Sequence, residues 1–102
     1  MSEIQTVFAV IEASESDMRL VQAAVANLAR QSAAEPECLR YDAHLSLKEP
    51  TRLIIHEIWG SEKALQSHRE SVHVAQVKAS LIRTSAKLWA SAFHLLPGKA
   101  NL

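Results

Sequence analysis

Residues 54–73 read IIHEIWGSEKALQSHRESVH, and this stretch decides the fold. An apolar, β-branched run ends at Trp59, Gly60 interrupts it, and Ser61 with Glu62 forms a typical beginning of a helix. The run predicts a strand over residues 52–59, followed at once by a turn and a helix. That helix is expected to bend near Ser71 and to continue through Ile82.

Three further strands and one long helix are predicted around this stretch. The strands cover residues 4–12, 38–47 and 86–96, which are rich in apolar and β-branched side chains. Between the first two, apolar residues recur every three or four positions over roughly 16 to 20 residues, with Ser14 or Ser16 as the N-cap and Pro36 as the stop. A short turn at residues 48–50 joins 38–47 to 52–59 as an antiparallel hairpin.

The order of these elements is strand, helix, strand, strand, helix, strand. This βαββαβ order is typical of the ferredoxin-like α+β fold, a four-stranded antiparallel sheet with its helices on one face. Both alternate sets of the first strand are largely apolar, so the other sheet face needs a cover from outside the chain. We therefore expect one domain over residues 1–102, with a core over about 4–96, a frayed tail at 97–102, and a homodimer through the sheet face.

The composition narrows the class of protein. Eleven basic and eleven acidic residues cancel, and no Lys/Arg cluster indicates binding to nucleic acid or to an anionic membrane. No apolar run approaches the roughly 18 residues of a membrane-spanning helix. The N-terminus lacks the layout of a signal peptide, and the single Cys38 suits a reducing compartment. We expect a cytoplasmic protein.

His68 and His73 are the first candidates for chemistry. Five positions on a continuous helix are about 500° of rotation, which leaves the two side chains roughly 140° apart, so they do not form the i, i+4 pair of a helical metal site. A bend near Ser71 could bring both to one pocket, where they would orient a polar substrate or move a proton. The alternative is a backbone-bonded histidine at a helix end and a solvated one.

Glu57 lies inside an apolar strand, next to Trp59. A buried carboxylate has a raised pKa, which suits a general base, and His44 or Arg52 is its expected partner. The alternative is an ion pair at the rim. Trp59 is either a core side chain or a ring stacked on a ligand, and His56 is expected on the face opposite Glu57.

No cofactor is predicted. The five histidines show no metal-ligand spacing with Cys38 or a carboxylate, so no metal is expected. With only Gly60 and Gly98 in the chain, there is no glycine-rich loop for a nucleotide or flavin phosphate.

Five short segments, taken in order, resemble the antibiotic biosynthesis monooxygenase domain family. They are EPECLRYD at 35–42, PTR at 50–52, EIW at 57–59, SEKAL at 61–65 and HRESVH at 68–73. The resemblance covers about residues 6–95. It implies a dimeric α+β barrel built from ferredoxin-like subunits, each with a pocket between sheet and helices.

The resemblance also implies site residues. Characterised relatives include cofactor-independent oxygenases of anthrones and quinols, haem-degrading oxygenases, and an enzyme that acts on a phosphorylated autoinducer-2 product. The positions of this chain that match are Glu57, Trp59, His68 and His73, with Tyr41 and His44 as expected walls of the pocket.

The chain departs from the family pattern at several positions. Glu37 stands where a Gly is usual, and Val72 where a Pro is usual. The haem-degrading branch has an Asn on the first strand and a His in the second helical segment; here the first strand has no Asn and Lys78 stands in the place of that His. Haem degradation is therefore disfavoured.

Two functions remain open. The first is a cofactor-independent monooxygenase acting with dioxygen on an aromatic quinol, phenol or anthrone, with His68 or His73 as proton acceptor, Glu57 as orienting group or alternative base, and Trp59 as ring contact. The second is an isomerase-like enzyme, or a binding module, for a small polar metabolite. A deep apolar cavity would favour the first, and a small pocket lined by His and Arg the second.

Overall fold

A computed structural model describes residues 3–96, and the predicted order of elements is confirmed. The elements are β1 Gln5–Glu12, α1 Glu15–Ala33, β2 Cys38–Leu45, β3 Arg52–Trp59, α2 Glu62–Arg69, α3 Val72–Leu81 and β4 Lys87–Phe93. The tail expected over residues 97–102 lies outside the described residues.

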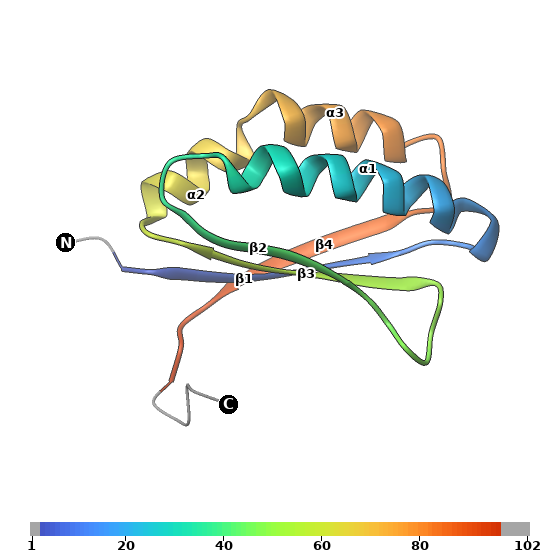
Figure 1. The fold of residues 1–102 in the computed structure, drawn as a ribbon, viewed down its shortest axis with the longest axis horizontal. Helices are drawn as coiled ribbons and strands as arrows, with labels where there is room; N and C mark the ends of the chain where they lie inside the picture. Colours follow the sequence, from blue (N-terminus) through green and yellow to red (C-terminus); the bar gives the residue numbers. More distant parts are fainter. Residues whose placement is uncertain (1–2, 97–102) are drawn as a thin grey trace.

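The four strands form one antiparallel sheet in the order β2-β3-β1-β4, and all three helices lie on one side of it (Figure 1). The expected hairpin is the β2–β3 pair, in which Tyr41 lies opposite Glu57. On β1, Val7 is the partner of Glu57. Glu57 is therefore in the middle of the sheet, with strands on both sides.

Serine side chains cap the helices and explain the break in the second helical segment. Ser61 Oγ accepts a hydrogen bond from Ala64 N at 3.1 Å and begins α2. Ser71 has extended backbone (ψ 156°) and accepts from Val74 N at 3.3 Å, which ends one helix and begins the next. The predicted bend near Ser71 is therefore a true boundary between α2 and α3.

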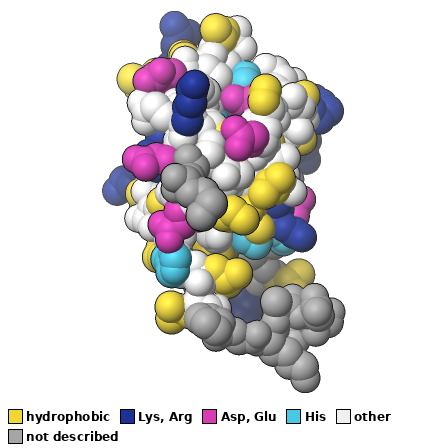
Figure 2. Space-filling view, turned by 90° about the vertical axis from the view of Figure 1, so that its left-hand side faces the viewer, with side chains coloured by type: hydrophobic (Ala, Val, Ile, Leu, Met, Phe, Trp, Pro, Cys, Tyr) yellow, Lys and Arg dark blue, Asp and Glu magenta, His cyan; other side chains and the backbone are white. Residues whose placement is uncertain are grey.

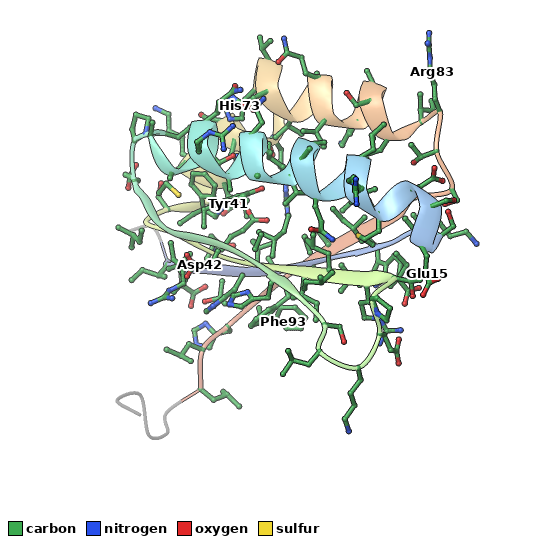
Figure 3. The ribbon with its side chains drawn as sticks, turned by 45° about the vertical axis from the view of Figure 1, so that its right-hand side comes forward. Glu15, Tyr41, Asp42, His73, Arg83 and Phe93 are labelled. Carbon is green, nitrogen blue, oxygen red and sulfur yellow. The ribbon has the colours of Figure 1, made fainter. Side chains whose placement is uncertain are left out.

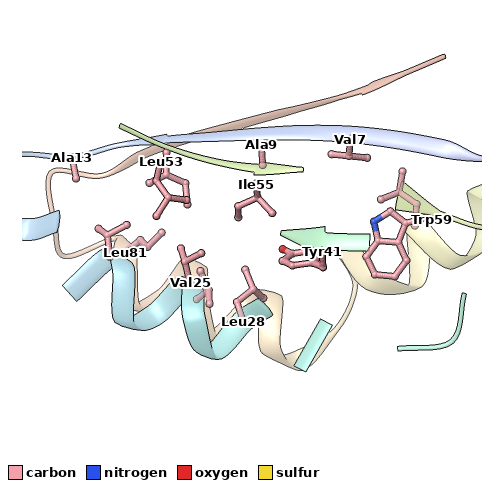
Figure 4. Packing of buried hydrophobic residues seen from close by; sticks show 14 of the residues in the cluster. Val7, Ala9, Ala13, Val25, Leu28, Tyr41, Leu53, Ile55, Trp59 and Leu81 are labelled. Atoms are coloured by element: carbon pink, nitrogen blue, oxygen red, sulfur yellow. The ribbon is translucent and has the colours of Figure 1, made fainter. Parts of the chain in front are cut away.

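The core lies between the sheet and the helices. Figure 4 shows Ala9 and Ile55 on the sheet facing Val25 and Leu28 on α1. Burial alternates along β3, so that Leu53, Ile55, Glu57 and Trp59 all point toward the helices. Glu57 is the one carboxylate in this alternating set, which places it at the core.

The opposite sheet face carries exposed apolar side chains, and no helix or strand within residues 3–96 covers it. Phe8 is 40% exposed and Ile54 37% exposed. The ring of Phe8 stacks on His56 at 4.8 Å and meets the edge of Phe93 at 5.6 Å. Figure 3 shows Tyr41 on the helix side of the sheet and Phe93 on the other side.

Within residues 3–96 no helix is both long enough and apolar enough to cross a membrane. On the face of the molecule drawn in Figure 2, basic and acidic side chains are interspersed with hydrophobic ones. This face carries no large patch of a single charge.

Candidate functional site

A cavity of about 310 Å³ lies between the sheet and the helices. Its wall is mostly aliphatic and aromatic, with a small group of ionisable side chains. The lining residues are Val7, Ala9, Ile11, Leu28, Tyr41, Ile55, Glu57, Leu65, His68, Arg69, Val74, Val77, Lys78, Leu88, Trp89 and Ala90. An apolar hollow with a few converging polar groups is the usual form of a small-molecule site.

Glu57 is the buried acid of this cavity. It is 4% exposed, and its Oε1 accepts a hydrogen bond from Trp59 Nε1 at 2.9 Å. Burial raises the pKa of Glu57 from 4.5 to about 7, although the Trp59 hydrogen bond and the charge of Arg69 act in the opposite direction. Near neutral pH this carboxyl can therefore both release and accept a proton.

His68 lies beside Glu57 and lines the same cavity. It projects from the last turn of α2, is 5% exposed, and its Nε2 is 3.7 Å from Glu57 Oε1. Burial lowers the pKa of His68, while a hydrogen bond and the charge of Glu35 act to raise it. The imidazole is therefore mainly neutral at pH 7 and can accept a proton.

Glu35 joins the two histidines of the HRESVH segment. Its Oε2 is 2.7 Å from His68 Nδ1 and 2.9 Å from His73 Nε2. The loop that carries Glu35 is held in place by a bond from Cys38 N to Glu35 O (3.1 Å) and by one from Gly60 N to Glu37 O (2.9 Å). The loop thus attaches to the turn that precedes α2.

Glu35 was not among the predicted site residues. It is 33 positions from His68 and 38 from His73, so no local spacing connects them. The one available signal was its position at the start of the EPECLRYD segment.

Glu35, His68 and His73 each offer a possible ligand atom, and these atoms lie within 4.8 Å of one another. One oxygen of Glu35 already lies at hydrogen-bond distance from both ring nitrogens. We therefore interpret this group as a hydrogen-bonded polar cluster.

Tyr41 lies in the cavity wall and projects from β2. Its ring centroid is 5.4 Å from that of His68, and burial raises the pKa of its hydroxyl. The hydroxyl therefore stays protonated at neutral pH and is a possible hydrogen-bond donor to a ligand.

Two residues that were predicted to line the pocket, Trp59 and His44, do not lie in the cavity wall. Trp59 is fully buried and is not part of the cavity wall; its ring packs 4.5 Å from that of His68, so it supports the site from behind instead of contacting a ligand. His44 pairs with Ile54, is exposed, and lies on the sheet face opposite the cavity, because strand side chains alternate and Tyr41 takes the inner side.

The expected partners of Glu57 were also wrong. Arg52 binds Glu12 through Nε at 2.7 Å and lies near Glu49, away from the cavity. The groups close to Glu57 are Trp59 and His68. His73 lies outside the cavity wall, in a shallow groove between α1 and α3, and its hydrogen bond to Glu35 connects it to the site.

A sequence profile of the antibiotic biosynthesis monooxygenase family matches residues 4–80. The chain belongs to this family. The match includes Glu35, Tyr41, Glu57, His68 and His73, and membership supports a monooxygenase-like function. No curated protein matches the chain in sequence.

Solved structures share the fold of this monooxygenase family member. A candidate antibiotic biosynthesis monooxygenase from Deinococcus radiodurans superposes with a TM-score of 0.88 at 19% identity, over 96% of this chain and 98% of that chain. A second candidate, from Nitrosomonas europaea, gives 0.84 at 18% identity, over 94% and 93%. A Pseudomonas aeruginosa protein gives 0.87 at 23% identity, over 95% and 98%. At these identities the likeness shows the fold.

Proposed function

We propose that this protein is a cofactor-independent monooxygenase of an aromatic quinol, phenol or anthrone. The supporting observation is the mostly apolar cavity of about 310 Å³ with Glu57 and His68 side by side in its wall. The volume is at the lower end of the roughly 300–1,000 Å³ of small-molecule sites, which suits a planar compound of two or three rings.

The reaction needs a base and an apolar surrounding. His68 Nε2, or Glu57 as alternative base, takes a proton from the acidic C–H or O–H of the substrate and leaves a delocalised anion. For an anthrone, this carbanion adds dioxygen to give a peroxide, which takes the proton back as a hydroperoxide. The hydroperoxide then loses water and leaves a carbonyl group, so one oxygen atom enters the product and the other leaves as water.

The ionisable side chains of the wall each have a role in this reaction. Glu57 Oε1 and His68 Nε2 lie 3.7 Å apart in the cavity wall, so either group can take the substrate proton. Tyr41 donates a hydrogen bond to the oxygen on which negative charge develops. Arg69 and Lys78 are exposed residues that border the cavity and add positive charge near its mouth.

The proposal includes a homodimer in the cytoplasm. The uncovered face around Phe8, Ile54 and Phe93 would pack against the same face of a second chain. The single Cys38, half-buried and free, is in keeping with a reducing compartment.

Oxygen uptake with anthrone and with menadiol tests the function. We expect uptake with wild-type protein and a loss of at least about 100-fold in kcat for His68→Ala, because a general base is removed. His94→Ala is the matched control, since that histidine is exposed and bonds Glu3 away from the cavity. Full activity in a His68→Ala, His73→Ala double variant would contradict the assigned roles.

A second function is favoured by Arg69 and Lys78. Two cations at the cavity wall also suit an isomerase or a binding module for a small anionic metabolite. Such a ligand would raise the melting temperature without oxygen uptake. Oxygen uptake with anthrone or menadiol would favour the monooxygenase over this second function.

A further inference from the structure

His68 lies between two carboxylates, one on each side of its ring. Nδ1 is 2.7 Å from Glu35 Oε2, and Nε2 is 3.7 Å from Glu57 Oε1. Glu57, on the Nε2 side of the ring, lines the cavity. Glu35, on the Nδ1 side, does not line it and lies in the loop between α1 and β2. The two nitrogens of the ring therefore have different surroundings.

We propose that Glu35 is a positioning residue that holds His68 in the tautomer with the proton on Nδ1, so that the Nε2 lone pair faces Glu57 and the cavity. A neutral imidazole has one donor and one acceptor, and a carboxylate can only accept. At 2.7 Å from Glu35 Oε2, Nδ1 must carry the proton. Nε2 is then the atom that receives a proton from the substrate.

His73 fixes Glu35 from the other side. Its Nε2 is 2.9 Å from the same Oε2, so this oxygen accepts from both rings. Two donors from different helices on one oxygen restrict rotation of the carboxylate. The side chains are well shielded, with 7% exposure for His68, 15% for Glu35 and 16% for His73.

The negative charge of Glu35 also stabilises the imidazolium that forms when His68 takes the proton. The acidic residue of a catalytic triad acts on its histidine in the same way. The other groups that face His68 are Glu57 on β3, Arg69 on α2, His73 on α3, and the hydroxyl of Tyr41 on β2. The charges of Arg69 and His73 oppose a positive ring, whereas Glu35 favours it.

The orientation of His68 can be tested without any substrate; its catalytic consequence rests on the proposed function. Nitrogen-15 NMR of the imidazole nitrogens reports the tautomer directly. We expect the Nδ1–H form for His68 in wild-type protein above its pKa. Observation of the Nε2–H form would overturn the proposal.

Glu35→Gln removes the charge and keeps the size, and Glu37→Gln is the matched control on the same loop, where the side chain touches Ser61 and neither histidine. We expect the NMR-measured pKa of His68 to be lower in Glu35→Gln than in wild type and in Glu37→Gln. Equal pKa values in all three proteins would overturn the proposal. Because the tautomer is measured in wild type, the test stands even if Glu35→Gln fails to fold.

The kinetic test separates positioning from binding. With anthrone, Glu35→Gln should lower kcat on the order of 100-fold, change KM less than about threefold, and move the acid limb of the pH–rate profile to lower pH. An equal kcat and an unmoved profile would refute the role in catalysis. Absence of oxygen uptake by wild type would instead count against the proposed function, and the NMR result would still decide the orientation.

Discussion

Replacement of Glu57 by Gln should make the protein more stable at alkaline pH. The carboxylate is 4% exposed, and burial raises its pKa from 4.5 to about 7. The folded state therefore holds this proton more tightly than the unfolded chain does. Stability falls as pH rises from about 4.5 to about 7 and levels off above that range. Gln carries no charge, so the Glu57→Gln protein does not lose this stability as the pH rises.

The magnitude follows from the two pKa values. A tenfold change in proton affinity corresponds to about 1.4 kcal/mol, so a pKa of about 7 instead of 4.5 corresponds to roughly 3 kcal/mol above pH 7. Gln keeps the acceptor for Trp59 Nε1 but brings an amide donor into the cavity wall, which costs about 1 kcal/mol. We expect a net gain of about 2 kcal/mol at pH 8, and roughly 10 °C in melting temperature.

Urea unfolding of wild type and Glu57→Gln at pH 5 and pH 8, at one protein concentration, measures this difference. The two proteins should differ by less than about 1 kcal/mol at pH 5, where the carboxyl is mainly protonated. Glu70→Gln, an exposed acid at the end of α2, should show no such pH-dependent gain. A Glu57→Gln protein no more stable than wild type at pH 8 would refute the reasoning.

Three further changes test other parts of the structure. Trp59→Phe removes the donor that lowers the Glu57 pKa, so the acid limb of the kcat/KM profile should move to higher pH; an unmoved limb would argue against Glu57 as a titrating group of the site. Phe8→Glu should convert a dimer into a monomer in sedimentation equilibrium, whereas Leu20→Glu, at a half-exposed position on α1, should not; a dimeric Phe8→Glu protein would exclude the sheet face as the interface. Treatment with EDTA should leave oxygen uptake unchanged, and a loss restored by a divalent metal would show that the reaction needs one.

The sequence predicted the fold because its signals are local. Strand alternation, the serine caps and the break at Ser71 each depend on residues close together in the chain, and each has its counterpart in the structure. The left-handed backbone at Glu37 (φ 61°) explains why a Gly is usual there: the departure noted in the sequence occurs at a position that favours Gly.

The site was only partly accessible from the sequence. Alternation correctly separated Glu57 from His56, but it could not show that Trp59 is sealed behind Glu57 instead of facing a ligand. The role of Glu35 depends on contacts across more than thirty residues, which no spacing rule reports. His44 was expected at the pocket from the resemblance and as a partner of Glu57 from the neighbouring strand, but the β2–β3 register puts it on the other face.

The most direct test of the central claim is turnover of anthrone under ¹⁸O₂ by metal-free protein. If the cavity beside Glu57 and His68 supports cofactor-independent monooxygenation, one dioxygen is consumed for each anthrone and one ¹⁸O atom appears in the new carbonyl group of the product. A Glu57→Gln, His68→Ala double variant should lose this labelling. An unlabelled carbonyl oxygen, which would come from water, would contradict the claim. So would NMR evidence that anthrone binds in the cavity without any oxygen uptake.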